Sequence, residues 1–298
     1  MIQKFDERNR NIKVWIDGLL FDRSQAKVSV FDSSVQGGDA VWEGLRVYAG
    51  KIFCFNEHIN RLIESAKSLD FKMIPTVKYI KEAVYTTLKA NGMKDDTHIR
   101  LTLTRGVKIT SGMNPQLNQS GCTLIVLAEW KSPIFYGREL KLITSSIRRN
   151  SPLCLDSKIH HANLLNNILA KIEANNAGVD DALMLDLDGF IAETNSCNIF
   201  MIKNNTVFTS YPKACLPGIT RRIVIHLCEL NNIAIKERDI SLTEIYNADE
   251  VFTTGTMGEL TRVVEIDKRK LTNKGNLFNK IQILFKEMTK KQGEKLLF

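Results

Sequence analysis

The segment 130–138 near the middle of the chain constrains the fold most, because strand and helix patterns occur on both sides of it. It contains Pro133 and Gly137, which are typical of connections between domains. The chain has 298 residues, a length at which one hydrophobic core usually stops growing. We therefore predict a small N-terminal domain over residues 1–129, a linker over 130–138 and a larger C-terminal domain over 139–298.

Strand and helix patterns follow one another without strict β-α-β order, which predicts an α+β architecture with a small N-terminal α/β domain. Apolar residues at the helical period predict helices that begin near Asn56 and Thr76. Lys27–Phe31 is predicted as a short strand. Asp188-Gly189 predicts a hairpin turn. Ser241-Leu-Thr-Glu244 has the spacing of a capping box and predicts a short helix.

Charge and composition exclude several classes of protein. The 41 basic residues are mixed with 33 acidic ones and give a net charge of +8, which we interpret as a basic surface and not as nucleic-acid binding. The apolar stretch Cys122–Ala128 is too short to span a membrane. The N-terminal residues are polar and of mixed charge, unlike a signal peptide, so we expect a cytoplasmic protein. We predict no metal site, because His160 and His161 are neighbours whose side chains diverge and no CxxC pair is present.

Two local patterns suggest chemistry but leave alternatives open. Leu216-Pro-Gly-Ile-Thr220 precedes an apolar helix, and such a helix start either binds an anion or is a plain turn. In Glu193-Thr-Asn-Ser-Cys-Asn198, the Glu193 carboxylate lies at the end of a predicted strand, where it could pair with a cation. The alternative is that this segment is a solvated turn.

Taken together, five blocks resemble class IV (fold type IV) pyridoxal-phosphate aminotransferases, and among them branched-chain amino-acid aminotransferases most closely. The resemblance runs from about Trp15 to Asp267, and its blocks stand in the expected order. They are Val35–Arg46, Glu57–Leu62, Ser157-Lys158 with Asn163–Ala174, Glu193–Phe200 with Leu216–Thr220, and Thr253–Glu259.

The resemblance implies a two-domain fold type IV enzyme with pyridoxal 5'-phosphate as cofactor. Lys158 matches the catalytic lysine that binds the cofactor covalently and then moves the substrate α-proton. Glu193 matches the carboxylate that faces the pyridine nitrogen. Leu216 matches the apolar residue that stacks on the cofactor ring. Four further positions match residues that bind the cofactor phosphate: Arg61, Ile219, Thr220 and Thr256.

Substrate positions follow from the same resemblance. Trp42 and Gly44 match residues that line the side-chain pocket, and Trp130 matches a pocket wall. Arg100 matches an arginine that binds the second carboxylate of glutamate or 2-oxoglutarate. The backbone of Thr256-Met257 matches the site of the α-carboxylate. In this family the partner subunit helps to cover the active site, so a homodimer or larger homo-oligomer is expected, with amino acids and 2-oxo acids as small-molecule partners.

Several positions depart from the branched-chain pattern. Leu164 replaces a tyrosine beside the cofactor, Gly37 replaces a pocket tyrosine, and Asn195 is unusual in the Glu193 block. The stretch from Lys158 to Glu193 is also one residue longer. The leading prediction is transamination of leucine, isoleucine or valine with 2-oxoglutarate. The alternatives are a D-amino-acid aminotransferase or an aminodeoxychorismate lyase, in which leucine occupies the position of Leu164.

Overall fold

The computed structural model describes residues 4–135, 137–272 and 275–298. Residue 136 of the predicted linker and residues 1–3 of the N-terminal segment lie outside this description. The chain divides into two compact units. The N-terminal unit comprises residues 4–132, Ile159–Asn163 and Thr289–Phe298, and the C-terminal unit comprises Pro133–Lys158 and Leu164–Met288.

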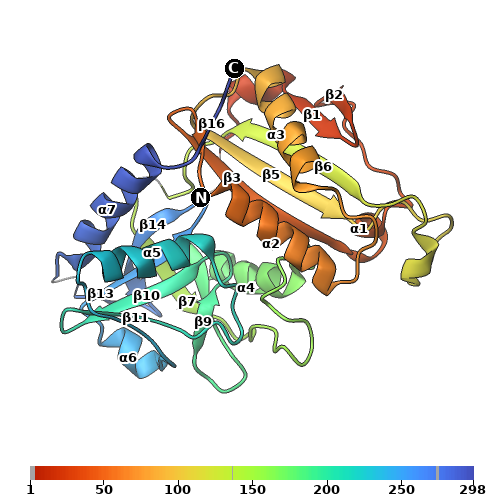
Figure 1. The fold of residues 1–298 in the computed structure, drawn as a ribbon. Helices are drawn as coiled ribbons and strands as arrows, with labels where there is room; N and C mark the ends of the chain where they lie inside the picture. Colours follow the sequence, from red (N-terminus) through yellow and green to blue (C-terminus); the bar gives the residue numbers. More distant parts are fainter. Residues whose placement is uncertain (1–3, 136, 273–274) are drawn as a thin grey trace. The chain divides into compact units, whose positions relative to one another are not determined.

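The N-terminal unit is built on an antiparallel sheet that has seven strands among the described residues (Figure 1). Their order across the sheet is β16-β4-β3-β5-β6-β1-β2. The two longest pairings join β3 to β5 and β5 to β6, and both run in continuous register. The strands are β1 (Lys13–Ile16), β2 (Leu19–Asp22), β3 (Ala40–Tyr48), β4 (Lys51–Ile52), β5 (Thr97–Thr104), β6 (Thr123–Trp130) and β16 (Glu294–Lys295).

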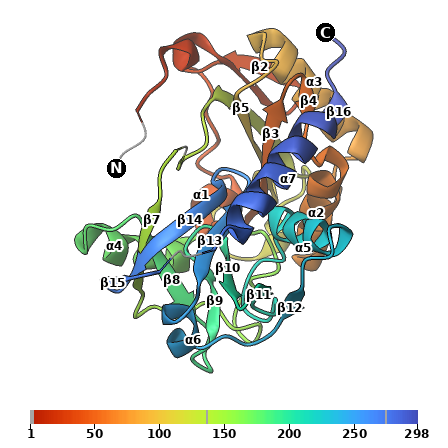
Figure 2. The same cartoon turned by 90° about the vertical axis from the view of Figure 1, so that its left-hand side faces the viewer.

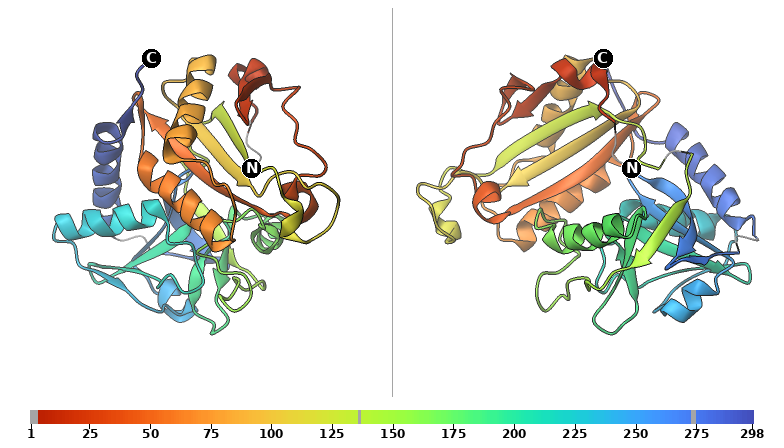
Figure 3. Two further views of the ribbon diagram at one scale, coloured as in Figure 1. Left: turned by 45° about the vertical axis from the view of Figure 1, so that its right-hand side comes forward. Right: turned by 180° about the vertical axis from the view of Figure 1, so that it is seen from behind.

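Two helices, α2 (Phe55–Ser68) and α3 (Val77–Asn91), cover one face of this sheet (Figure 3, right panel). Each presents an apolar stripe at the helical period, for example Ile59, Leu62 and Ala66 of α2, all of which are fully buried. These side chains form one core with alternate residues of β3, β5 and β6. Short helices lie at the margins of the unit: α1 (Ser33–Gly37) and the 3₁₀ helices Glu7–Asn11 and Pro115–Leu117.

The C-terminal unit has a mixed sheet in the order β12-β11-β10-β13-β14-β7-β8-β9, with β15 added beside β14. The pairs β11–β12, β14–β7 and β7–β8 are parallel, and the others are antiparallel. The strands are β7 (Leu140–Thr144), β8 (Asp181–Leu185), β9 (Ile191–Thr194), β10 (Asn198–Lys203), β11 (Thr206–Thr209), β12 (Ile235–Glu237), β13 (Glu250–Gly255), β14 (Glu259–Ile266) and β15 (Arg269–Lys270).

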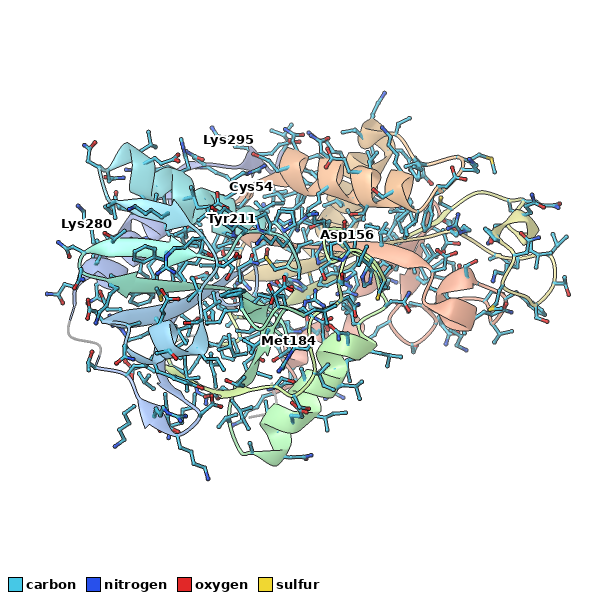
Figure 4. The ribbon with its side chains drawn as sticks, turned by 90° about the horizontal axis from the view of Figure 1, so that it is seen from below. Cys54, Asp156, Met184, Tyr211, Lys280 and Lys295 are labelled. Carbon is cyan, nitrogen blue, oxygen red and sulfur yellow. The ribbon has the colours of Figure 1, made fainter. Side chains whose placement is uncertain are left out.

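Four helices pack on this sheet within the described part of the unit: α4 (Leu165–Asn176), α5 (Ile219–Leu230), α6 (Leu242–Tyr246) and α7 (Leu277–Lys291). Helix α4 packs its alanines against Met184 of β8, which is labelled beside the helix in Figure 4. Helix α7, which faces the viewer in Figure 2, begins over β13, where Phe278 packs against Phe252. The core between the sheet and α6 is a second apolar cluster.

Several local predictions can be compared with this fold. The hairpin at Asp188-Gly189 is confirmed by the antiparallel pair β8–β9. The capping box at Ser241 is confirmed, since its hydroxyl accepts from the backbone N–H of Glu244 while the Glu244 carboxylate accepts from that of Ser241. The strand predicted over Lys27–Phe31 is wrong. Val28, Val30 and Phe31 are exposed in an irregular segment, and the neighbouring strand forms earlier, at Leu19–Asp22.

Within the described residues, no helix combines the length and apolar character needed to cross a membrane. The same residues contain no cluster of three or more His, Cys, Asp or Glu side chains arranged to hold a metal ion.

Candidate active site

Lys158 lies on the irregular loop between β7 and α4, close to Asp156, which is labelled in Figure 4. The Lys158 backbone N–H donates to the Asp156 carboxylate (3.0 Å), and its ammonium lies 3.6 Å from the same carboxylate. Its side chain is 47% exposed. Because an ion pair this exposed contributes only about 0–1 kcal/mol, Asp156 does not hold the Lys158 side chain firmly in place.

Glu193 is a buried carboxylate at the end of β9. Its Oε1 accepts from the Nε of Arg149 (2.8 Å), and its Oε2 accepts from the amide of Asn198 (3.2 Å). Arg149 is itself buried, and its Nη1 donates to the Asn166 and Asn167 side chains of α4. Burial raises the pKa of Glu193, and the Arg149 charge opposes that shift. The arrangement provides a paired negative charge away from water.

The start of α5 lies beside Glu193, and Gly218 occupies its N-cap position without a side-chain cap. The amide of Asn198 donates to the Leu216 carbonyl (2.8 Å), and the Leu216 N–H points to Glu193 Oε1 (3.4 Å). A Cβ on Gly218 would lie 2.1 Å from the Asn198 carboxamide oxygen. An uncapped helix start with adjacent backbone N–H groups can bind an anion such as phosphate.

An orphaned hydroxyl lies in the same part of the unit. Thr254 on β13 stands opposite Asn198 in the β10–β13 ladder, and its Oγ1 is buried without a hydrogen-bond partner within the described parts of the chain. A buried polar group left in this way costs about 1–3 kcal/mol, which favours a further group at this corner. Thr220, at the start of α5, is also buried.

The tight turn from β13 to β14 carries Thr256 and Met257, both half-buried. Gly255 and Gly258 let this turn approach Cys197, whose sulfur would lie 3.0 Å from a Cβ on Gly255. The Met257 carbonyl accepts from the N–H of Ile134 (2.8 Å). The turn is therefore held from both sides, which suits a site where backbone N–H groups bind a carboxylate.

In the N-terminal unit, Arg61 of α2 belongs to a buried charge cluster centred on Glu43 of β3. The Arg61 guanidinium donates from Nε to Glu43 Oε1 (2.7 Å) and from Nη2 to Oε2 (2.8 Å). His58 and His160 also face this carboxylate, at 2.6 and 3.1 Å. Burial opposes ionisation of Glu43, but its neighbours His160 and Arg61 outweigh burial and hold its pKa well below the usual value.

Trp42 and Arg100 are in direct contact in the same unit. The Arg100 guanidinium lies 3.4 Å from the centroid of the Trp42 ring, a cation–π arrangement. Gly44 pairs with Arg100 across β3 and β5. A Cβ on Gly44 would lie 3.1 Å from Nε2 of His98, a buried atom with no hydrogen-bond partner in the described chain. Burial lowers the pKa of His98 to about 3, so this ring is neutral at pH 7.

Trp130 has different surroundings. It pairs with Thr97, whose side chain lies on the core-facing side of β5, and it packs against the core under the helices. The Arg8 guanidinium lies 5.3 Å from its ring centroid. Its expected role as a pocket wall stays a prediction.

The structure thus groups the predicted residues in two sets. Within the C-terminal unit it brings Glu193 and Leu216 together at the start of α5. Within the N-terminal unit it brings Trp42, Gly44 and Arg100 together. The sequence reasoning missed the partners of these residues, namely Arg149, Asn198, Glu43, His98 and His160. A charged residue in an apolar strand pattern, as at Glu43, could have indicated a buried ion pair, whereas His160 was weighed only as a metal ligand.

The positions that depart from the branched-chain pattern also have structural roles. Asn195 completes the β8–β9 pairing, because its Oδ1 accepts from the N–H of Ala182 (2.7 Å) and its own N–H donates to the Ala182 carbonyl (2.9 Å). Leu164 is half-buried and stands at the N-cap of α4 without a side-chain cap. A Cβ on Gly37 would meet no atom within 4 Å, so this position has room for a side chain.

The chain is similar in sequence and in structure to known aminotransferases. A family model for amino-transferase class IV matches residues 40–266. A branched-chain-amino-acid aminotransferase of Pseudomonas aeruginosa is 31% identical over an alignment 284 positions long, which covers 88% of this chain and 87% of that protein. The crystal structure of a branched-chain amino acid aminotransferase from T.th., complexed with N-(5'-phosphopyridoxyl)-L-glutamate, matches with a TM-score of 0.87 and 30% identity. That match covers 94% of this chain and 95% of that one.

A relative from Arabidopsis thaliana, branched-chain-amino-acid aminotransferase-like protein 2, is 56% identical over 288 residues, or 96% of this chain. The match covers 52% of that protein. The chain therefore spans about half the length of this curated relative.

Proposed function

This chain belongs to the class IV aminotransferases, and we propose that it catalyses pyridoxal-phosphate-dependent transamination of branched-chain L-amino acids with 2-oxoglutarate. The products are 2-oxo acids and L-glutamate. The observation that carries the proposal is the buried Glu193 carboxylate, which is hydrogen-bonded to Arg149 and Asn198 beside the uncapped start of α5. The similar crystal structure with bound phosphopyridoxyl-glutamate supports the same cofactor and substrate class.

The residues of the C-terminal unit are compatible with pyridoxal phosphate. The uncapped start of α5, the buried Glu193 carboxylate and the orphaned Thr254 hydroxyl are complementary to a phosphate and a ring nitrogen, and Lys158 is exposed beside Asp156. When bound, the cofactor supplies a carbonyl group and an electron-withdrawing ring. We propose that Lys158 would hold the cofactor through its amine and would move a proton at the substrate α-carbon. Glu193 would place negative charge toward the ring nitrogen, and Ile219, Thr220, Thr256 and Arg61 would hold the phosphate.

For the substrate, we propose that Trp42 and Gly44 contact the side chain of the amino donor, with Trp130 as a further wall. Arg100 binds the second carboxylate of 2-oxoglutarate. Burial lowers the pKa of Arg100 to about 10, although the Glu43 charge opposes this shift, so the guanidinium keeps its positive charge at neutral pH. The backbone of Thr256-Met257 binds the α-carboxylate.

A second candidate function rests on Leu164, a leucine where the branched-chain pattern has a tyrosine. It favours a D-amino-acid aminotransferase or an aminodeoxychorismate lyase with the same cofactor. Losing one hydrogen bond to the cofactor corresponds to about a three- to tenfold effect, which retunes activity without abolishing it. A panel of amino donors with 2-oxoglutarate decides between the candidates. Higher activity with D-alanine or D-glutamate than with every branched L-amino acid favours the second.

Lys158→Ala tests the catalytic assignment. We expect no measurable turnover, while the variant still binds pyridoxal phosphate without a covalent bond. Borohydride reduction followed by peptide mapping is expected to label Lys158 in the wild-type protein and no lysine in the variant. Lys280→Ala, an exposed lysine on α7, is the matched control. Turnover by Lys158→Ala at the wild-type rate, or labelling of another lysine, contradicts the assignment.

We also propose a homodimer or larger homo-oligomer that acts on small molecules and binds neither nucleic acid nor membranes. A cytoplasmic location is part of the same proposal and rests on the composition.

A further inference from the structure

His160 connects two predicted functional residues of the N-terminal unit. It follows Lys158 closely in the sequence, on the segment Ile159–Asn163, which groups with the N-terminal unit although Lys158 groups with the other. Its backbone carbonyl accepts from the N–H of Trp42 (2.9 Å), and its backbone N–H donates to the Ser65 hydroxyl (3.1 Å). The segment therefore binds both β3 and α2, which fixes the position of the His160 ring.

One side of the ring contacts Trp42. The two ring centroids are 4.1 Å apart with a tilt of 39°, within the range of favourable aromatic pairs. The Trp42 indole N–H donates to the neighbouring His161 carbonyl (3.1 Å). The indole also contacts Arg100, so its orientation depends on contacts from two elements.

The polar edge of the ring contacts the Glu43–Arg61 pair. Nδ1 of His160 lies 3.1 Å from Glu43 Oε1 and 3.5 Å from Nη2 of Arg61. Two donors cannot share a hydrogen bond, and the shorter contact is with the acceptor, so Nδ1 carries the proton and donates to Glu43. Burial lowers the pKa of His160 to about 4, and the Glu43 charge opposes that shift. His160 thereby helps to orient the carboxylate that holds the Arg61 guanidinium.

From these contacts we infer that His160 is a positioning residue with two separable actions. Its ring face holds the Trp42 indole for the side chain of the amino donor, and its Nδ1–H, through Glu43, holds Arg61 for the cofactor phosphate. The inference rests on the function proposed for Trp42 and Arg61.

Two variants separate these actions. His160→Phe keeps an aromatic ring against Trp42 and removes the donor to Glu43. His160→Asn keeps a polar group at the place of Nδ1 and removes the ring. We expect His160→Phe to raise the Kd of the apoenzyme for pyridoxal phosphate by about three- to tenfold, the effect of one hydrogen bond, with the KM for leucine unchanged. We expect His160→Asn to raise the KM for leucine by a similar factor, with kcat and the cofactor Kd close to wild type.

Wild-type protein and His226→Asn, an exposed histidine on α5, are measured alongside, together with the unfolding temperature of each apoprotein. Wild-type values in both variants, or a parallel loss of both parameters, overturn the inference, because a merely structural role moves both together. If neither variant folds, His160→Tyr and His160→Gln replace them, because the first keeps an aromatic ring against Trp42 and the second keeps a polar group without the ring. The same split between the cofactor Kd and the leucine KM is expected, and unchanged values or a parallel loss of both overturn the inference. If the wild-type protein neither binds pyridoxal phosphate nor transaminates, the proposed function fails and the inference falls with it.

Discussion

The carboxylate of Glu193 lies inside the C-terminal unit, where an ionised carboxylate costs several kcal/mol unless it is paired. Arg149 supplies the pairing charge, and it is held in turn by Asn166 and Asn167. Since burial raises the pKa of Glu193, the ionised state that the proposed chemistry requires depends on this arginine. Glu193, the residue proposed to face the cofactor ring, and Arg149, the residue that favours its ionised state, are thus distinct.

Replacement of Arg149 by methionine tests this dependence. The change leaves Glu193 buried without its counter-charge, so we expect the free energy of unfolding of the apoprotein to fall by about 3–5 kcal/mol at pH 8. A buried acid with a raised pKa retains its stability below its unfolded pKa and loses it as the pH rises. The deficit relative to wild type is therefore expected to be smaller at pH 5 than at pH 8. Urea unfolding at both pH values measures this difference.

Arg149→Lys is the matched control for this experiment. It keeps a positive charge and is expected to recover part of the stability at pH 8, although a lysine cannot reproduce the arginine hydrogen bonds. Equal deficits of the methionine variant at pH 5 and pH 8 would contradict the electrostatic role of Arg149.

At the scale of elements, the close approach of the Asn198 side chain to the Gly218 backbone decides the geometry around α5. Gly218 has no side chain, and the Asn198 carboxamide occupies the space that a Cβ would need. Asn198 uses that position to join Glu193 to Leu216, so the end of β9 and the start of α5 are held by one amide. A glycine here is required by packing and not by a positive φ.

Gly218→Ala is therefore expected to displace Asn198 and both of its hydrogen bonds. We expect a weaker affinity for pyridoxal phosphate, by about tenfold or more, and a lower unfolding temperature of the apoprotein. Titration of the apoprotein with the cofactor and thermal unfolding measure the two effects. Gly37→Ala is the control for stability, because a Cβ there meets open space, and its unfolding temperature should not fall. An unchanged affinity in Gly218→Ala would show that Asn198 does not organise this corner.

The sequence predicts features that depend on neighbouring residues, and it does not predict those that depend on packing between distant segments. The hairpin at Asp188-Gly189 and the capping box at Ser241 depend on neighbouring residues, and local patterns identified both. The apolar run Lys27–Phe31 has the composition of a strand, but the structure leaves its side chains exposed without a sheet partner. The pairing of Glu43 with Arg61 depends on how α2 packs on β3, which no local pattern encodes.

At the scale of the molecule, the division into two units does not follow the order of the chain. Lys158, Glu193 and Thr220 belong to the C-terminal unit, whereas Arg61 belongs to the N-terminal unit. The chain also returns to the N-terminal unit at Ile159–Asn163, directly after the lysine. The sequence analysis predicted residues 139–298 as one domain. It could not predict that Ile159–Asn163 belongs to the N-terminal unit, because no change in composition marks this short segment.

The surface of α4 bears on the prediction of a homodimer. Leu165, Ile168, Leu169 and Ile172 lie on one face of this helix at the helical period, and their exposed fractions are 69, 49, 49 and 46%. Contiguous exposed apolar side chains of this kind are typical of protein–protein contacts. We therefore expect a second copy of the chain to cover this face.

Light scattering coupled to gel filtration tests the assembly. We expect the wild-type chain to elute at no less than twice its mass of 33.8 kDa. Ile168→Glu places a charge in the middle of the α4 face, and burial of an unpaired charge is strongly unfavourable, so the variant is expected to shift toward monomer and to lose activity with it. Leu230→Glu is the matched control, because Leu230 is similarly exposed at 63% but lies at the end of α5. A fully active wild-type monomer contradicts the dimer, and a dimeric Ile168→Glu variant excludes the α4 face from the interface.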